Sequence, residues 1–409
     1  MSKRNLTLLT DLYELTMMQG YYEKGQNEKV IFDVFFRQNP CNNGYSVCAG
    51  LDQVIDYIKN LHFTYEDVDY LRGLGIFKED FLHYLSGFHF SGDIYAIPEG
   101  TVVFPKEPLL KVIAPIMEAQ LVETAILNII NHQSLIATKT SRIVFAANGD
   151  GIMEFGLRRA QGPDAGLYGA RAAMIGGCVG TSNVLAGQIF NIPVKGTHAH
   201  SWIMSFPDEL TAFRTYAKMY PDACILLVDT YDTLKSGVPH AIEVFKELRD
   251  AGITSKLLGI RLDSGDIAYL SKKARKMLDD AGFTNAIISA SSDLDEYLIN
   301  SLKTQGCTVT SWGVGTNLIT SSDNPAFGGV YKLAAIKKPG DKEFTAKIKI
   351  SENPEKITNP GNKTIYRIYD KESSKIKADL ICLVGETFDP SEDLKIFDPI
   401  STWKKSILP

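Results

Sequence analysis

Residues 257–290, LLGIRLDSGDIAYLSKKARKMLDDAGFTNAIISA, contain the pattern that decides the fold. An apolar run at 257–262 is followed by a helical repeat at 267–281 that stops at a glycine, and a second apolar run follows at 286–290. A strand, a helix and a strand joined by short connections are typical of a parallel βαβ unit, because the helix carries the chain back to the starting edge of the sheet.

The same alternation extends over the middle of the chain. Helical repeats separate most of the strand-like apolar runs, which lie at 152–155, 192–195, 224–228, 257–262, 286–290, 308–312 and 329–335. Seven such runs in succession favour a barrel over an open sheet. We therefore predict a parallel α/β barrel as the catalytic domain, over residues 146–338.

The two flanking parts have different patterns. Residues 1–145 mix helical spacing with strand-like stretches such as 30–36, which predicts an N-terminal α+β domain. After about residue 340, lysine-rich polar stretches alternate with β-type segments such as 363–369. We predict that this β-rich segment, 339–409, packs on the N-terminal domain and completes it.

Composition excludes several classes of protein. The 409 residues include 43 basic and 48 acidic side chains, so there is no basic excess for contacts along a nucleic-acid backbone. The longest apolar runs, such as 223–228, are far shorter than the roughly 18 residues of a membrane helix. Asp11 interrupts the N-terminus before a signal-peptide core can form, and the six cysteines form no Cys-x-x-Cys pair. We expect a cytoplasmic protein without a disulfide framework or zinc site.

Polar residues follow the predicted strands at their carboxyl ends. In a parallel barrel these ends share one face, where catalytic groups gather. We expect six post-strand segments to converge on one pocket: 155–162, 196–201, 229–232, 261–266, 291–293 and 313–317.

Two of these features suit phosphate or carboxylate groups. The Gly313-Val-Gly-Thr-Asn317 segment could turn backbone N–H groups toward a phosphate, although a simple tight turn has the same composition. Arg158, Arg159 and Arg261 could bind anionic oxygens through their guanidinium forks, with Lys139 and Arg142 as further candidates. The alternative for these cations is ordinary salt bridges.

The acidic and histidine candidates also have two interpretations. Asp263 could hold Mg²⁺ through water or accept hydrogen bonds from sugar hydroxyls, and Asp266 is better placed to cap the following helix. His198 and His200 could be metal ligands, but no other histidine follows a later strand to complete such a site. A histidine beside a phosphate pocket could instead be a nucleophile or an acid/base group, and a structural role is the alternative.

With these residues in place, the chain resembles the nicotinate phosphoribosyltransferase family. The resemblance runs from Thr10 to about Ile336 and rests on phrases at 10–13, 35–40, 154–163, 180–187, 199–201 and 261–266. It implies an irregular seven-stranded α/β barrel beside an N-terminal α/β domain, in a homodimer with shared active sites. It also implies the reaction of nicotinate with 5-phosphoribosyl-1-diphosphate to nicotinate mononucleotide and pyrophosphate in NAD salvage, with Mg²⁺ and coupled ATP hydrolysis.

The resemblance assigns roles to individual residues. His200 corresponds to the histidine that ATP phosphorylates, and Asp263 resembles a contact to the ribose hydroxyls. Phe155 corresponds to one stacking face for the pyridine, and Tyr13 from the other subunit to the opposite face. The remaining substrate-binding positions, Leu157, Arg158, Ser182, Thr197, Arg261, Gly313, Gly315 and Thr316, include candidates for the phosphates and the nicotinate carboxylate. No protein cage for a metal is expected.

Three other functions are alternatives for this sequence. The nicotinamide phosphoribosyltransferase family is similar at 180–181 but has an aspartate where Ser182 stands, and a carboxylate there would repel nicotinate. Quinolinate phosphoribosyltransferases are less similar, because a diacid calls for more cations and the Ala-His-Ser phrase at 199–201 is absent from them. A non-catalytic sensor of NAD precursors on the same fold is disfavoured by the presence of His200, Arg261 and Asp263 together.

Overall fold

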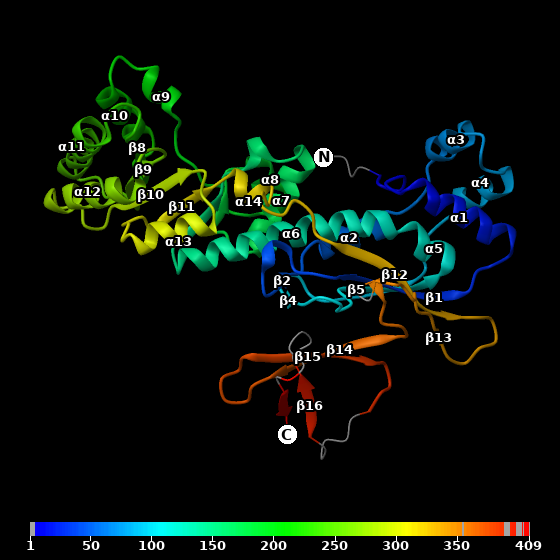
Figure 1. Ribbon diagram of the computed structural model, residues 1–409. Coiled ribbons are helices and arrows are strands. Elements are labelled where there is room, and N and C mark those ends of the chain that lie inside the picture. The colour runs from blue at the N-terminus through cyan, green and yellow to red at the C-terminus, as the bar shows by residue number, and fades with distance from the viewer. Residues whose placement is uncertain (1–4, 354–355, 388–392, 398–402, 404, 409) are drawn as a thin grey trace.

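The chain folds into three parts that lie along an elongated molecule. The computed structural model describes residues 5–353, 356–387, 393–397, 403 and 405–408. Figure 1 shows a parallel sheet with its helices at one end, an antiparallel sheet with its helices at the other, and C-terminal strands beside the antiparallel sheet. Small parts of the predicted segments 1–145 and 339–409 lie outside the described residues.

The parallel sheet is a half-barrel of six strands in the order β7-β6-β11-β10-β9-β8, with every neighbouring pair parallel. The strands are β6 (Gly151–Glu154), β7 (Gly180–Thr181), β8 (Ala223–Leu227), β9 (Leu257–Leu262), β10 (Ile287–Ser292) and β11 (Ser311–Val314). The helices are α7 (Pro163–Ile175), α8 (Val184–Phe190), α9 (His200–Met204), α10 (Glu209–Met219), α11 (Val238–Asp250), α12 (Ile267–Asp280), α13 (Glu296–Thr304) and α14 (Thr316–Ile319). The βαβ alternation predicted from the sequence is confirmed.

The predicted number of barrel strands is wrong. The run at 192–195 contributes only an isolated bridge between Val194 and Thr181. The run at 329–335 belongs to β12 (Gly329–Lys337), which pairs antiparallel with β1 (Lys29–Phe36) in the other sheet. An apolar run specifies a strand but not the sheet it joins, and the four-residue α14 is too short to be the crossover helix of a further parallel strand.

The N-terminal unit is built on a five-stranded antiparallel sheet in the order β13-β12-β1-β5-β3, and β1 is buried along nearly its whole length. The other strands are β3 (Asp93–Ala96), β5 (Leu110–Pro115) and β13 (Thr345–Ala346), and β2 (Ser46–Val47) pairs separately with β4 (Val102–Val103). One face is covered by α1 (Leu12–Glu23), α2 (Leu51–Lys59), α3 (Tyr65–Gly73), α4 (Glu79–Ser86), α5 (Ile116–Leu121) and α6 (Glu123–Ala147). This is the predicted α+β arrangement.

Helix α6 belongs to both cores. Ile126 and Ile130 lie in the core of the N-terminal unit, whereas Ile136 and Ile143 lie in the core of the half-barrel. Within the half-barrel part of the helix lies the buried Lys139, which is 1% exposed and pairs with Glu296 of α13 and with Asp323, each at 2.8 Å. Burial alone would lower the pKa of Lys139, but hydrogen bonds and charge from Asp323 and Glu296 outweigh it, so the pKa is raised and the lysine stays charged.

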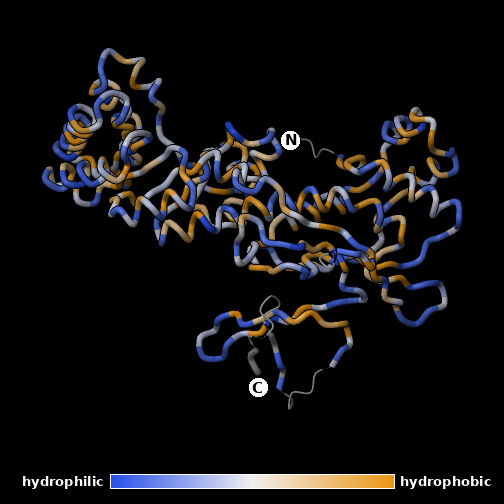
Figure 2. Tube along the Cα trace, in the orientation of Figure 1, coloured by the Kyte–Doolittle hydropathy of each residue, from blue (hydrophilic) through white to orange (hydrophobic). Residues whose placement is uncertain are grey.

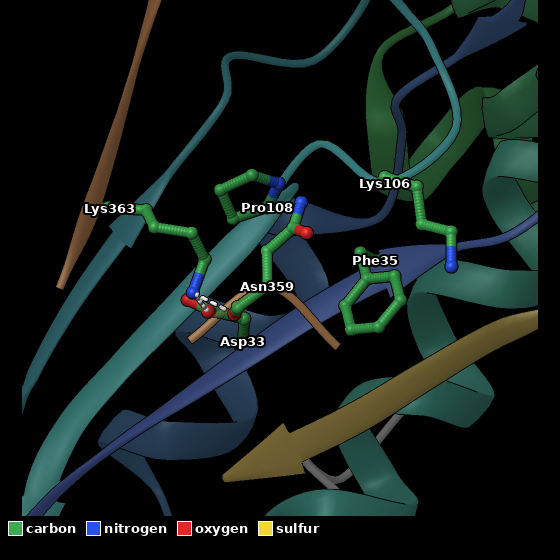
Figure 3. Close-up of a pocket in the computed structure, with 6 residues that line it drawn as sticks. All are labelled: Asp33, Phe35, Lys106, Pro108, Asn359 and Lys363. Carbon is green, nitrogen blue, oxygen red and sulfur yellow. Dashed lines mark hydrogen bonds and ion pairs between the residues drawn. The ribbon is translucent and has the colours of Figure 1, made fainter. Parts of the chain in front are cut away.

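The C-terminal segment covers the other face of β1. Side chains alternate along a strand, so Ile31, Asp33 and Phe35 point away from the helices. Figure 3 shows Lys363 reaching Asp33, with a 2.6 Å ion pair at the edge of a small cavity that Phe35 also lines. The strands of this segment after β13 are β14 (Lys363–Tyr369), β15 (Ile376–Leu383), β16 (Leu394–Phe397) and β17 (Lys405–Leu408). The Lys363–Asp33 pair joins this segment to the N-terminal unit.

The distribution of hydropathy follows this arrangement. Figure 2 shows hydrophilic loops between β12 and β13 and between β14 and β15, at the outer edges of the molecule. Among the helices in the described ranges, none combines the length and the apolar character that a membrane crossing requires.

The buried ion pairs of α6 predict a stability effect. Lys139→Met leaves the carboxylate of Asp323 without its cation and Glu296 with Arg142 as its remaining partner, so we expect the free energy of unfolding in urea to fall by about 3 kcal/mol. Lys276→Met is the control, because Lys276 is 72% exposed in its pair with Asp280. Its loss should cost at most about 0.5 kcal/mol. Equal losses in the two variants would contradict the structural role given to Lys139.

Candidate active site

A hydrogen-bonded network joins four of the predicted segments at the carboxyl ends of the parallel strands. His200, the first residue of α9, places its Nε2 3.2 Å from Oδ1 of Asp229, which directly follows the last strand residues of β8. The other oxygen of Asp229 accepts from the backbone N–H of Asp263 at 2.8 Å and from Oγ of Ser264 at 2.7 Å. Asp229 is therefore saturated, and it orients both His200 and the loop that carries Asp263.

Asp263 is the second acidic member of the network. Its Oδ1 accepts a hydrogen bond from Oγ of Ser291 at the end of β10. Within the part of the chain that the structure describes, its Oδ2 has no hydrogen-bond partner. The next helix begins at Asp266, whose Oδ1 accepts from the N–H of Tyr269 at 2.9 Å. The predicted division, with Asp266 as cap and Asp263 left available, agrees with these contacts.

Cations without carboxylate partners lie beside this network. Of the arginines in the described ranges, Arg37, Arg158, Arg159 and Arg261 form no ion pair with an aspartate or glutamate. Arg261 donates to Oγ1 of Thr197, and its Nε is buried without a hydrogen-bond partner in the described structure. Burial lowers the pKa of Arg261 and outweighs the opposing charges of Asp263 and Asp229, and the positive charge of Arg158 adds a smaller contribution in the same direction as burial. Two neighbouring guanidinium groups with free donors suit an anionic ligand.

An aromatic ring and a pair of glycines form the opposite part of the site. The ring of Phe155 lies directly on Gly313, where an added Cβ would overlap it. Gly315 approaches the backbone of Phe155, with an added Cβ at 3.3 Å from its carbonyl oxygen. Because Gly313 pairs in register with Ser291, this part adjoins the carboxylate network. Leu157 and Arg158 follow on an exposed turn, so all six predicted segments meet at one edge of the sheet.

Ser182 is held at the end of β7 by the backbone of Glu154, whose buried carboxylate binds the neighbouring residues Thr181 and Gly156. Its N–H donates to the carbonyl oxygen of Glu154 at 3.0 Å. The Glu154 side chain is fully buried and accepts from Oγ1 of Thr181 at 2.5 Å and from the N–H of Gly156. Burial raises the pKa of Glu154. This arrangement fixes the positions of Ser182 and Phe155 on neighbouring strands.

The comparisons with known proteins agree along the chain. The sequence profile of the nicotinate phosphoribosyltransferase family matches residues 151–373, and the profiles of its N-terminal and C-terminal domains match 8–131 and 362–409. The chain is 52% identical to the nicotinate phosphoribosyltransferase of Bacillus subtilis over 400 residues, which is 98% of this chain and 80% of the relative. The chain belongs to the nicotinate phosphoribosyltransferase family.

More distant relatives have the same overall arrangement. The nicotinate phosphoribosyltransferase of Homo sapiens is 32% identical over 96% of this chain and 82% of its own length. The crystal structure of human nicotinic acid phosphoribosyltransferase superposes with a TM-score of 0.80, covering 98% of this chain and 86% of that one. A nicotinate-nucleotide pyrophosphorylase from Pyrococcus furiosus, with a TM-score of 0.73 and 23% identity over 100% of this chain and 90% of that one, shares the fold.

In this member of the nicotinate phosphoribosyltransferase family, three candidates have structural roles. Lys139 and Arg142 both pair with Glu296, so the salt-bridge interpretation holds for these two cations. His198 is buried, with its Nε2 3.4 Å from the N–H of Leu227 and its ring against Tyr216. Burial lowers the pKa of His198 to about 4, and the charge of Arg261 adds to this. A neutral core histidine is the role that fits.

Two residues that matter for the site received no role from the sequence. Asp229 was placed in a post-strand segment, but nothing in the spacing shows that it meets His200, which precedes it by 29 positions. Glu154 lies in a sequence pattern typical of a strand. Only the structure shows that its side chain is buried and bonded to Thr181, the residue before Ser182, and that it directly precedes Phe155. The available signal is a carboxylate at the end of an apolar run: Glu154 is the last residue of β6, and Asp229 comes two residues after the end of β8.

Tyr13 and Thr316 differ in their relation to the site. Thr316 starts α14 directly after Gly315 and lies with the other site residues. Tyr13 lies on α1 in the N-terminal unit, 46% exposed, at the end of the molecule away from the half-barrel (Figure 1). Among the described side chains, no three His, Cys, Asp or Glu residues cluster as they would around a protein-held metal.

The buried His198 predicts a pH dependence of stability. Its folded pKa of about 4 lies below the ordinary value of 6.5, so between these values the unfolded chain binds a proton that the folded chain does not. The free energy of unfolding should therefore fall as the pH drops from 6.5 to 4, by up to about 3 kcal/mol. Urea unfolding of His198→Phe over this range should show a flatter dependence. Parallel curves for the parent and the variant would contradict this role.

Proposed function

We propose that this chain catalyses the transfer of the 5-phosphoribosyl group from 5-phosphoribosyl-1-diphosphate to nicotinate, yielding nicotinate mononucleotide and pyrophosphate for NAD salvage. The observation that carries the proposal is the juxtaposition, at one edge of the half-barrel, of Arg158 and Arg261 without carboxylate partners and the network of His200, Asp229 and Asp263. The 52% identity to a nicotinate phosphoribosyltransferase supports it.

The substrates fit the chemistry of the two parts of the site. The ring of Phe155, seated on Gly313, offers a flat apolar face for a pyridine, and Arg158 and Arg261 offer donors for the nicotinate carboxylate or a phosphate. Leu157 and Ser182 flank the aromatic part, and Thr197 orients Arg261. Gly315 and Thr316 would bind the 5-phosphate through the turn before α14.

The chain supplies positioning and charge stabilisation to the reaction. Breaking the bond between the sugar C1 and pyrophosphate develops positive charge on the ribose and negative charge on the leaving group. Arg261 and its neighbours would neutralise the second, and the Asp263 carboxylate would contact the ribose hydroxyls. Oδ2 of Asp263 is a hard oxygen donor without a protein partner in the described structure, so Asp263 fits a Mg²⁺ ion held through water. Bound Mg²⁺ would neutralise pyrophosphate charge.

His200 is the proposed point of coupling to ATP. Asp229 accepts the hydrogen on Nε2, which leaves the lone pair of Nδ1 free. The γ-phosphoryl group of ATP would form a bond to Nδ1 as its bond to the departing ADP breaks, giving a phosphohistidine that water later hydrolyses to phosphate. The resulting charge beside the pyrophosphate site would couple ATP hydrolysis to the transfer reaction.

A homodimer would complete the site. Tyr13 is exposed on α1 together with Leu12, which is 54% exposed, and Met17, which is 39% exposed. Beside Ser182, the helix α8 exposes Val184 at 72% and Ile189 at 42%. Covering two separate apolar surfaces, one on α1 and one on α8, is what a symmetric pair of chains achieves, and it would place Tyr13 of one chain opposite Phe155 of the other.

A product assay tests the proposed reaction. Purified protein is supplied with 5-phosphoribosyl-1-diphosphate, Mg²⁺ and either nicotinate or nicotinamide, with and without ATP. We expect nicotinate mononucleotide, formed faster with ATP and accompanied by ADP. Turnover of nicotinamide instead would favour the nicotinamide phosphoribosyltransferase reaction and overturn the inference from Ser182. Binding of nicotinate without turnover of either base would favour a sensor.

The coupling role of His200 has its own test. His200→Ala removes the phosphoryl acceptor but leaves Phe155, Arg158 and Arg261 in place, so slow transfer should persist while the stimulation by ATP is lost. The measurement is the initial rate of nicotinate mononucleotide formation with and without ATP. Stimulation equal to that of the parent chain would exclude His200 as the acceptor.

A further inference from the structure

A second group of polar side chains lies behind the His200–Asp229 pair. Glu209, the first residue of α10, is 3% exposed and accepts a hydrogen bond from Oγ of Ser236 through its Oε2. Nδ1 of His240 lies 2.9 Å from the same oxygen. Ser236 belongs to a five-residue π-helical turn, η3 (Thr233–Gly237), which leads into α11 with His240 in its first turn.

The geometry of this group excludes a nucleophilic serine. A serine nucleophile donates its proton to a histidine nitrogen whose other nitrogen is held by the carboxylate. Here Ser236 donates to the carboxylate itself, and its Oγ is 3.4 Å from Nδ1 of His240, the nitrogen already beside Glu209. The three side chains therefore hold two elements together.

Each of those two elements, α10 and η3, adjoins the segment that carries one member of the active-site pair. Helix α9, with His200, is anchored to α10 by Trp202, whose Nε1 donates to the carbonyl oxygen of Ala212 at 3.3 Å. The turn η3 follows Asp229 after three residues and is capped by Asp232, whose Oδ1 accepts from the N–H of Lys235 at 2.9 Å. Glu209 links the two segments. It belongs to α10, to which α9 is anchored, and it accepts a hydrogen bond from Ser236 of η3, the turn that follows Asp229.

The turn η3 has little freedom relative to Asp229. Gly237 lies so close to β8 that an added Cβ would overlap the carbonyl oxygen of Val228, the residue before Asp229. A shift of η3 would therefore displace Asp229. Isolated π-turns are rare in proteins, and those that do occur often lie at functional sites. In the described structure Oε1 of the buried Glu209 has no hydrogen-bond partner. Burying such an oxygen lowers the stability of the fold. A role in positioning its neighbours therefore explains Glu209 better than a role in stability.

We propose that Glu209, together with Ser236 and His240, positions His200 against Asp229, so that Nε2 keeps its hydrogen bond and Nδ1 faces the phosphoryl donor. Glu209 is a positioning residue that acts through α9 and η3. The inference rests on the proposed function, because the consequence of correct positioning is the ATP stimulation assigned to His200.

The test compares Glu209→Ala with the conservative Glu209→Gln, which keeps an acceptor oxygen for Ser236 and His240. Glu243→Ala is the matched control, because Glu243 also links α11 to α10, through an exposed 2.7 Å pair with Arg214. We expect the ATP-stimulated kcat of Glu209→Ala to fall at least about tenfold, with ATP-independent transfer and both substrate KM values within about twofold. Glu209→Gln and Glu243→Ala should match the parent chain.

The variant Ser236→Ala and the double variant of Glu209→Ala with Asp229→Asn test the positioning role further. Ser236→Ala removes a donor without emptying the core, so it should fold and show a smaller loss of ATP stimulation. In the background of Asp229→Asn, the Glu209→Ala change should have no further effect, because the contact it supports is already altered. Additive losses, or equal losses in Glu209→Ala and Glu243→Ala, would overturn the positioning role.

A spectroscopic readout separates this inference from the proposed function. Ring-nitrogen NMR of histidine-labelled protein, assigned with His200→Ala, reports which nitrogen of His200 carries the hydrogen. We expect a single tautomer with hydrogen on Nε2 in the parent chain and a mixture in Glu209→Ala. If the parent shows no ATP stimulation, the coupling proposal fails, yet the tautomer result still decides the positioning. An unchanged tautomer in Glu209→Ala would refute it.

Discussion

The rest of the structure depends on helix α6, which is shared by two hydrophobic cores. Its first half packs under the antiparallel sheet and its second half under the parallel sheet. In the half that packs under the parallel sheet, the buried Lys139 is neutralised from α13 and from Asp323, so the helix cannot shift without separating buried charges. The shared helix sets the half-barrel and the N-terminal unit in one relative position, with α14 of the site near the middle of the molecule and α1, which carries Tyr13, at the far end of the N-terminal unit (Figure 1).

Along one edge of the parallel sheet, some charged side chains have hydrogen-bond partners and others do not, and this difference determines the properties of the site. His200, Asp229, Asp263 and Ser291 are joined by hydrogen bonds, whereas Oδ2 of Asp263 and Nε of Arg261 have no partner in the described structure. Satisfied carboxylates hold their loops in place at low cost, and unsatisfied guanidinium groups retain affinity for an anion. The Phe155 ring on Gly313 adds an apolar face, which suits a ligand that is both aromatic and acidic.

Prediction from sequence succeeded where a local pattern was sufficient. The alternation at 257–290 specified the βαβ units, and Arg261 near the end of β9 and Asp263 directly after it lie at the same edge of the sheet. It failed for 329–335, because the apolar run of β12 suits either sheet and only the packing against β1 decides between them. It also gave no role to Asp229 and Glu209, whose partners are 29 and 31 positions away.

The sequence by itself determined the family, the parallel architecture and the set of chemical groups available, since these follow from spacing, composition and recognisable phrases. Tertiary structure alone decided which groups are paired and which are free. Lys139 and Arg142 are occupied by Glu296, and His198 is a neutral core residue, whereas Arg261 is available to a ligand. The physical reason is that pairing and desolvation depend on distances between segments remote in the chain, which no local pattern encodes.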